Sequence, residues 1–167
     1  MNFAFYLDES HLVNLEAAFF NKFPQSEEGK TIDAESLSTG ASVFEKEVSG
    51  EYLYRHLNIL LAKHHSHHPV IETTEQLNRL AKGNIQEVSQ LAQGLFEHSA
   101  ALIACQIAGI AEFKGTDMVF VMEGSLFWDG WHYKQMVETY ISRLTKYKIT
   151  FKEIDNCGII GAAKLVT

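Results

Sequence analysis

Residues 118–125 read MVFVMEGS, a continuous apolar run that ends in a carboxylate, a glycine and a hydroxyl. Such a run is typical of a strand in a parallel sheet that is covered on both faces. In open α/β sheets, ligands bind outside the carboxyl ends of the strands, so Glu123, Gly124 and Ser125 stand where a nucleotide site would form. Taken alone, the three residues are explained equally well by an ordinary β-turn into the next helix.

A helix and a second strand are predicted after this stretch. Apolar residues recur there at helical spacing, with polar residues between them. They are Met136, Val137, Tyr140, Ile141 and Leu144. Residues 148–154 alternate between polar and apolar side chains, as a half-buried strand does. Strand, crossover helix and strand imply a parallel pair with a right-handed connection, which indicates the α/β class.

A second turn follows this strand. Residues 154–163 read IDNCGIIGAA, a small-residue loop that is expected to open a last helix over 158–165. Backbone N–H groups at such a turn can bind phosphate or pack under a nucleotide, and Asp155 or Asn156 could cap the helix. On spacing alone a tight turn without a ligand is favoured, because glycine loops are weak signals. The two turns should nevertheless open on the same edge of the sheet, because both end neighbouring parallel strands.

The first forty residues predict a strand and a loop. Residues 1–7 are mostly apolar and predict a buried strand. Residues 23–40 are polar and contain Pro24, Gly29 and Gly40, which predicts a loop. Apolar residues recur at helical spacing only after this loop.

Three helices are predicted before the apolar strand. The first runs from Phe44 to about Lys63 and has one apolar face. That face consists of Leu53, Leu57, Leu60 and Leu61. The second covers residues 72–81, with Gly83 as its stop. The third runs over residues 86–113.

The second half of the third helix is apolar on nearly every face. Residues 100–111 contain one clear exception, Gln106. A helix that is apolar all round is expected to be buried, and Cys105 is then a buried thiol.

Composition indicates one compact domain over residues 1–167. The chain is 46% hydrophobic and 21% charged, with a formal net charge of −7, which argues against nucleic acid or an anionic membrane as partner. Its longest uncharged apolar stretch, residues 98–111, is shorter than the roughly 20 residues of a spanning helix. With no signal-peptide pattern and two widely separated cysteines, a cytoplasmic setting is expected.

Two further features have a plain structural explanation beside a functional one. Glu45 follows the start of the first predicted helix, where the helix dipole favours a carboxylate whatever its function. The run from His64 to His68 suggests metal binding, but adjacent histidines cannot all point at one ion without strain. We therefore assign no metal site.

Several segments of the chain resemble segments of hexokinases, and they occur in the same order as in that family. Residues 40–53, GASVFEKEVSGEYL, resemble the hexokinase segment G-x-x-x-F-E-K-M-x-S-G-x-Y-L. Residues 121–127, VMEGSLF, resemble V-D-G-S-L-Y, and residues 154–163 resemble the closing adenosine motif S-E-D-G-S-G-x-G-A-A. Weaker similarity covers residues 74–77 and 86–90, and a helix around 97–112 that resembles the one carrying S-x-R-A-A.

The resemblance implies a fold and a reaction. It implies an actin-like ATPase fold of the ribonuclease H-like type, of which this chain would be one half-domain with a small, mostly parallel or mixed sheet and several packed helices. The family transfers the γ-phosphoryl group of Mg-ATP to the 6-hydroxyl of glucose or a similar hexose. By position, Glu45 matches a carboxylate that hydrogen-bonds sugar hydroxyls. The positions that match the nucleotide side are Gly50, Glu51, Gly124, Ser125, Gly158, Ile159, Ile160, Gly161 and Ala162.

The chain also departs from the family pattern. The D-x-G-G-T-N phosphate loop, the catalytic aspartate and the second phosphate loop have no counterpart in its sequence, so the resemblance implies no catalytic residue here. Ala4 stands where a second sugar-binding glutamate would be. Glu123 replaces the aspartate of V-D-G, and Gly158-Ile159 replaces a serine-glycine pair.

Two functional hypotheses follow. A third option is that the chain is an unrelated α/β domain whose motifs match by coincidence. In the first, the chain is the C-terminal part of a hexokinase, and its partner is the missing N-terminal half. In the second, it is a non-catalytic module that binds a nucleotide or a partner. The second hypothesis predicts an exposed apolar patch and a dimer, because such patches mark interfaces.

Overall fold

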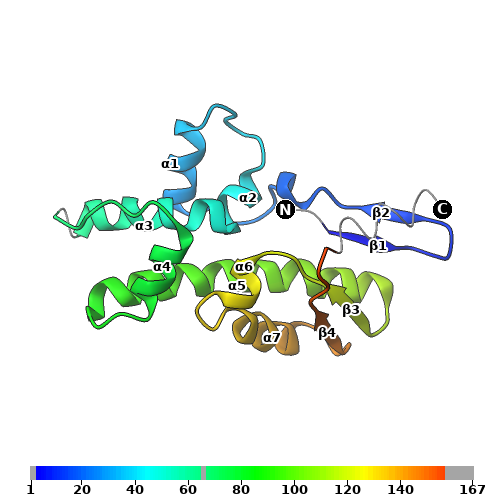
Figure 1. Cartoon of the computed structure of the whole chain (residues 1–167). Helices are drawn as coiled ribbons and strands as arrows, with labels where there is room; N and C mark the ends of the chain where they lie inside the picture. The colour runs from blue at the N-terminus through cyan, green and yellow to red at the C-terminus, as the bar shows by residue number, and fades with distance from the viewer. Residues whose placement is uncertain (1–2, 65–66, 157–167) are drawn as a thin grey trace.

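A computed structural model of the chain describes residues 3–64 and 67–156. Within these residues the fold contains seven α-helices, one short 3-10 helix and four short strands (Figure 1). In chain order these are β1 (Ala4–Tyr6), β2 (Leu12–Asn14), η1 (Ala17–Phe19), α1 (Glu27–Glu35), α2 (Val43–Val48), α3 (Gly50–His64), α4 (Thr74–Ala81), α5 (Gln86–Lys114), β3 (Met118–Val121), α6 (Ser125–Asp129), α7 (Tyr133–Leu144) and β4 (Ile149–Lys152).

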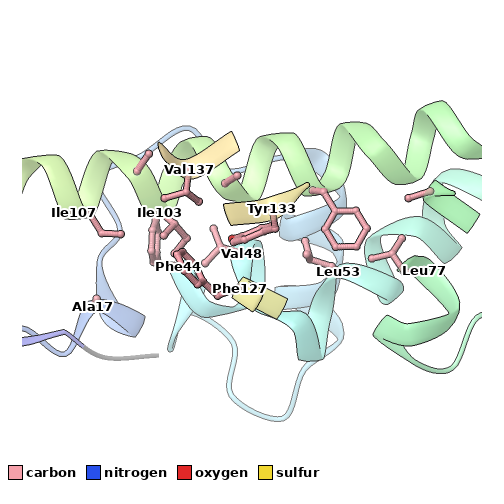
Figure 2. Close-up of a cluster of buried hydrophobic side chains, with 14 of the residues drawn as sticks. Ala17, Phe44, Val48, Leu53, Leu77, Ile103, Ile107, Phe127, Tyr133 and Val137 are labelled. Atoms are coloured by element: carbon pink, nitrogen blue, oxygen red, sulfur yellow. The ribbon is translucent and has the colours of Figure 1, made fainter. Parts of the chain in front are cut away.

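Helix α5 is the centre of the fold. It packs against α7 and also against α4, α3 and α2 (Figure 1). Phe96, Ala100, Ala104 and Ile107 on this helix are completely buried, and the two alanines let neighbouring helices approach closely. By length and composition α5 could cross a membrane, but the same test is met by a core helix of a soluble protein. Its buried face is the core shown in Figure 2.

The β3 and β4 strands run parallel, with α7 as the crossover helix between them. Met118 pairs with Ile149 and Phe120 with Phe151. This confirms the predicted strand, helix and strand. The β1 and β2 strands form a separate antiparallel hairpin, so the described residues contain two two-stranded sheets.

Both apolar strands are covered on one face only. The prediction that residues 118–122 are covered on both faces is wrong, because Val119 is 55% and Val121 45% exposed while Phe120 is buried. In the predicted strand at residues 1–7, Phe5 is buried but Tyr6 is 60% exposed. An apolar sequence shows that a face can be buried, but the neighbouring elements decide whether it is.

The loop predicted over residues 23–40 contains the helix α1. Ser26 caps it by accepting a hydrogen bond from the Gly29 N–H at 2.9 Å. Lys63 at the end of α3 donates to Glu28 at 2.7 Å, which ties the two helices together. These contacts stabilise a helix whose sequence carries only a weak apolar face.

A buried carboxylate completes the start of α1. Glu47 is fully buried in α2, and it accepts hydrogen bonds from the Ser26 N–H at 3.1 Å and from His98 at 2.8 Å. Burial by itself would raise the pKa of the Glu47 carboxyl, but the hydrogen bonds from His98 and Ser26 outweigh it and hold the pKa below its ordinary value. The resulting anion lies against the first turn of α1, where the helix dipole favours it.

The helix predicted from Phe44 to Lys63 is two helices. The chain is extended at Ser49, which separates α2 from α3. Leu53, Leu57 and Leu61 are buried as expected, and Leu60 is half-buried. The predicted helices over 72–81 and 86–113 are confirmed as α4 and α5.

Two side chains expected to be buried are exposed. Cys105 lies on an open face of α5, so the predictions of a buried thiol and of a helix buried all round are wrong. Leu144 at the end of α7 is 47% exposed. Each lies on an apolar face that no other described element covers completely.

The contact between Glu47 and α1 predicts opposite effects for two glycine substitutions. A Cβ at Gly29 would collide with Oε2 of the Glu47 carboxylate, a fully buried group whose other oxygen, Oε1, accepts from both Ser26 and His98. Gly29→Ala should therefore lower the free energy of unfolding by about 1–3 kcal/mol, as overpacking does. Gly94 is exposed in α5 with open space around it, so Gly94→Ala should raise that free energy by about 0.5–1 kcal/mol.

Urea unfolding of the three proteins measures both effects. Equal stabilisation by the two alanines would show that the carboxylate of Glu47 does not lie against this turn.

Candidate functional site

A hollow of about 390 Å³ lies at the carboxyl edge of the β3–β4 sheet. Its lining comes from both predicted turns and from the helix after the first one: Met122, Glu123, Gly124, Ser125, Trp128, Asp129, Glu153, Ile154, Asp155 and Asn156. The two turns therefore open on the same edge, as the sequence predicted.

The Gly124 backbone is open toward this hollow. Its φ of 102° lies in the region that side chains rarely adopt, and a Cβ there would meet nothing within 4 Å. Ser125 follows as the first residue of α6, and its side chain is exposed. The turn thus offers backbone and a hydroxyl to a ligand without a bulky side chain in the way.

Trp128 forms an aromatic wall of the hollow. Its indole N–H donates to the Met122 carbonyl at 3.1 Å, and the Phe127 ring packs edge-on against it with centroids 5.0 Å apart. The sequence interpretation missed this residue, although it lies three residues after Ser125 in a helix and so faces the same side. That spacing was the available signal.

The rim of the hollow is acidic. Four of its lining residues carry carboxyl groups, namely Glu123, Asp129, Glu153 and Asp155. Among the lining residues that the structure describes, none is lysine or arginine. No group of three or more His, Cys, Asp or Glu side chains in the described part of the chain is arranged to hold a metal ion.

Glu45 lies in the short helix α2, away from this hollow. It is half-buried between two buried neighbours, Phe44 and Lys46. The Phe44 ring packs against Phe23 with centroids 5.2 Å apart. Glu45 is therefore held in place by the residues on either side of it.

Lys46 anchors α2 to the preceding loop. It is 1% exposed, and its ammonium donates to Asp33 at 2.7 Å, to the Ser36 hydroxyl at 2.9 Å and to the Ser38 carbonyl at 2.8 Å. The Lys46 ammonium holds the pKa of Asp33 below its ordinary value, with help from the Gly40 N–H. All three ammonium protons are thus used, as a buried cation requires.

The start of α3 lies against α6. A Cβ at Gly50 would stand 3.6 Å from the Cβ of Leu126, and Thr74 donates to the Gly50 carbonyl. Gly50 is therefore behind the first turn of the hollow. Glu51 is exposed and pairs with Arg55 at 2.7 Å, outside the lining of the hollow.

The remaining nucleotide-side candidates lie outside the described residues. They are Gly158, Ile159, Ile160, Gly161 and Ala162, and the helix predicted over 158–165 lies there too. The structure thus brings Gly124 and Ser125 together with Asp155 and Asn156, and it places Glu45 elsewhere.

Comparisons with known proteins agree with this architecture. A family model described as Hexokinase matches residues 63–167. A solved structure of a hexokinase has 22% sequence identity and a TM-score of 0.74, covering 87% of this chain and 41% of its own. A hexokinase from Schistosoma mansoni, solved with glucose, has 15% identity and a TM-score of 0.67, covering 77% of this chain and 38% of its own. No curated protein matches the chain.

The fold is thus that of a hexokinase segment, and it spans about two fifths of the length of those solved proteins. The chain belongs to the hexokinase family.

The buried lysine beside Glu45 gives a stability prediction. Lys46→Met leaves Asp33 without its cation in a mostly buried place, so it should lower the free energy of unfolding by about 3 kcal/mol. Lys30 makes an exposed pair with Glu27, so Lys30→Met should change it by less than about 0.5 kcal/mol. Chemical denaturation of both variants provides the measurement, and similar values for the two would refute the anchoring role.

Proposed function

We propose that the chain is the C-terminal segment of a hexokinase-like sugar kinase, which phosphorylates glucose or a similar hexose at the 6-hydroxyl with ATP. The observation that carries the proposal is the meeting of the two turns in one hollow at the carboxyl edge of a parallel strand pair. This is where open α/β sheets bind their ligands. Membership of the hexokinase family supplies the reaction class.

The segment contributes part of two sites in this proposal. Gly124 and Ser125 contact the nucleotide, with Gly50 packed behind them. Residues 158–162, which lie outside the described residues, are the positions that the resemblance assigns to the adenosine. Glu45 accepts hydrogen bonds from the sugar hydroxyls. In fold terms the segment is one half of an actin-like ATPase, and the other half supplies the phosphate loops.

Mg-ATP is the cofactor that the family implies, and the hollow fits one part of it. The open backbone at Gly124 and the Trp128 ring suit a nucleoside. When bound, Mg-ATP supplies the phosphoryl group. Phosphoryl transfer further depends on phosphate-positioning loops and a base for the attacking hydroxyl, whose family motifs have no counterpart in this sequence. The chain alone is therefore expected to bind Mg-ATP but not to catalyse phosphoryl transfer.

Thermal unfolding with Mg-ATP tests the proposal. A ligand that binds only the folded chain at about 100 times its dissociation constant adds about 2.7 kcal/mol, which raises Tm by roughly 5–10 °C for a chain of this size. Ser125→Tyr should abolish the shift by filling the hollow. Ser142→Tyr, on the exposed face of α7, should leave it intact.

The same experiment with glucose tests the sugar side, where Glu45→Gln should remove any shift. Absence of a shift with Mg-ATP in the unmodified chain would contradict the proposed nucleotide site.

A second candidate function, partner binding, is favoured by an apolar groove that shares no lining residue with the hollow. The groove has a volume of about 580 Å³ and lies between the β1–β2 hairpin and the open face of α5. Leu7 and Phe113 on its lining are 44% and 68% exposed. Apolar surface of this kind is usually covered by another protein.

This alternative predicts that the chain dimerises. Sedimentation velocity over a range of concentrations should then show a dimer, and Phe113→Asp should shift it to monomer. Val70→Asp, an exposed position outside the groove, is the matched control. A chain that stays monomeric at every concentration rules out self-association through this groove.

A further inference from the structure

We propose that helix α1 is held on the fold by a carboxylate latch, and that α1 undocks when these carboxylates are protonated while the helices packed on α5 stay folded. The latch consists of Glu28 and Asp33 on α1 and Glu47 on α2. It goes beyond the proposed function, because it needs no ligand. It acts on the helix that carries Glu45, since α1 packs against α2.

Apolar packing contributes little to the docking of α1. Of its nine residues, all of them described, only Gly29 and Ile32 are buried. The helix packs against α2 and α3 at the edge of the fold (Figure 1). Helix α5, in contrast, buries residues along most of its length. An element with few buried apolar contacts opens at a lower free energy than the core does.

Charged pairs attach α1 to its two neighbours instead. In its first turn, Glu28 accepts a hydrogen bond from Lys63 of α3 at 2.7 Å. In its last turn, Asp33 accepts one from the buried Lys46 of α2 at 2.7 Å. The two carboxylates are only 16% and 14% exposed, so both pairs are partly shielded from water.

Glu47 supplies the third contact of the latch. Through Oε1 its fully buried carboxylate accepts from the Ser26 N–H before α1 and from His98 of α5. Oε2 lies against the first turn of α1 at Gly29, and it has no hydrogen-bond partner in the described part of the chain. The first turn of a helix presents N–H donors, so a proton on this carboxyl would find no acceptor there. The ionised form is therefore the one that joins α1, α2 and α5.

Lysine and histidine side chains face the three carboxylates. Lys63 and His56 of α3 face Glu28, Lys46 of α2 faces Asp33, and His56 and His98 face Glu47. On α1 itself, Glu27 pairs with Lys30 on the exposed side. A positive charge on either histidine favours an ionised carboxylate beside it. Protonation of the histidines therefore does not release the latch, whereas protonation of the carboxylates does.

Folding lowers the pKa of all three carboxyls. The hydrogen bond from Lys46 lowers the pKa of Asp33. Burial alone would raise the pKa of Glu28, but the hydrogen bond and charge of Lys63 outweigh it, and the pKa of Glu47 is held low by its own donors. A carboxyl with a lowered pKa stabilises the docked state above its unfolded pKa, and this contribution is lost as the pH falls through the folded pKa. Docking of α1 should therefore weaken as the pH falls below about 4.

Hydrogen exchange of the full chain, measured by mass spectrometry at about pH 7 and about pH 3, tests the latch. After correction for the intrinsic exchange rates, the protection of residues 27–35 should fall by about 10-fold to 150-fold more than that of α5, the loss that one charged hydrogen bond corresponds to. Equal losses in the two helices would overturn the proposal, because α1 would then open only with the whole fold. Unchanged protection of α1 would overturn it as well.

Substitutions at neutral pH test the carboxylate contacts directly. Glu47→Gln keeps the shape of the side chain but removes its charge, so it should lower the protection of α1 by about 10-fold to 150-fold. Lys63→Gln removes the exposed partner of Glu28 and should lower it by about 2-fold to 5-fold. Glu138→Gln, in an exposed pair with Lys134 on α7, is the matched control and should leave α1 unchanged.

An effect of Glu47→Gln no larger than that of the control would contradict the latch. If Glu47→Gln does not fold, Lys63→Gln decides the matter, because its exposed side chain is not part of the core. A loss of protection confined to α1 then supports the latch. A loss shared equally by α5, or no loss at all, overturns it.

Discussion

The hydroxyl of Ser99 joins the three helices on which both candidate sites depend. It donates to the Val48 carbonyl at 2.7 Å and lies 2.6 Å from the Tyr133 hydroxyl, which must donate to it because Ser99 has one proton. All three residues are buried, and Val48 and Tyr133 lie in the core shown in Figure 2. Burial raises the pKa of Tyr133, so the phenol remains a donor. Apolar packing alone permits neighbouring registers, whereas a satisfied buried network fixes one.

This register places the helix that carries Glu45 and the elements that line the hollow relative to each other. The carbonyl that accepts from Ser99 belongs to the last residue of α2, three residues after Glu45. The phenol belongs to the first residue of α7, and α6 packs against α7. Helix α2 ends at Val48, the backbone is extended at Ser49, and α3 begins at Gly50. Gly50 lies against Leu126 of α6. A shift of α5 by one turn would therefore displace both candidate sites together.

The sequence predicted the features that depend on the local spacing of hydrophobic residues. It missed those that depend on contacts between residues far apart in the chain. The parallel strand pair and the helices over 72–81 and 86–113 follow from hydrophobic spacing, and the meeting of the two turns follows from strand direction. Helix α1 was missed because its start is completed by Glu47, 21 residues after Ser26. The exposure of Cys105 and Val119 could not be predicted, because it depends on which faces other elements cover. In the site, the motif that resembles V-D-G-S-L-Y ends at Phe127, so it does not extend to Trp128.

The hollow itself depends on aromatic packing more than on the strand ladder. A two-stranded parallel sheet with one open face has little stability of its own. Here Phe151 of β4 packs against Phe120 and Phe127, with centroids 6.3 Å and 4.8 Å apart, and Phe3 packs edge-on against Phe120 at 6.4 Å. Because Phe127 also supports Trp128, the same cluster that holds the two strands together orients the aromatic wall of the hollow. Substitutions in this cluster are therefore expected to alter the geometry of the hollow and the stability of the chain together.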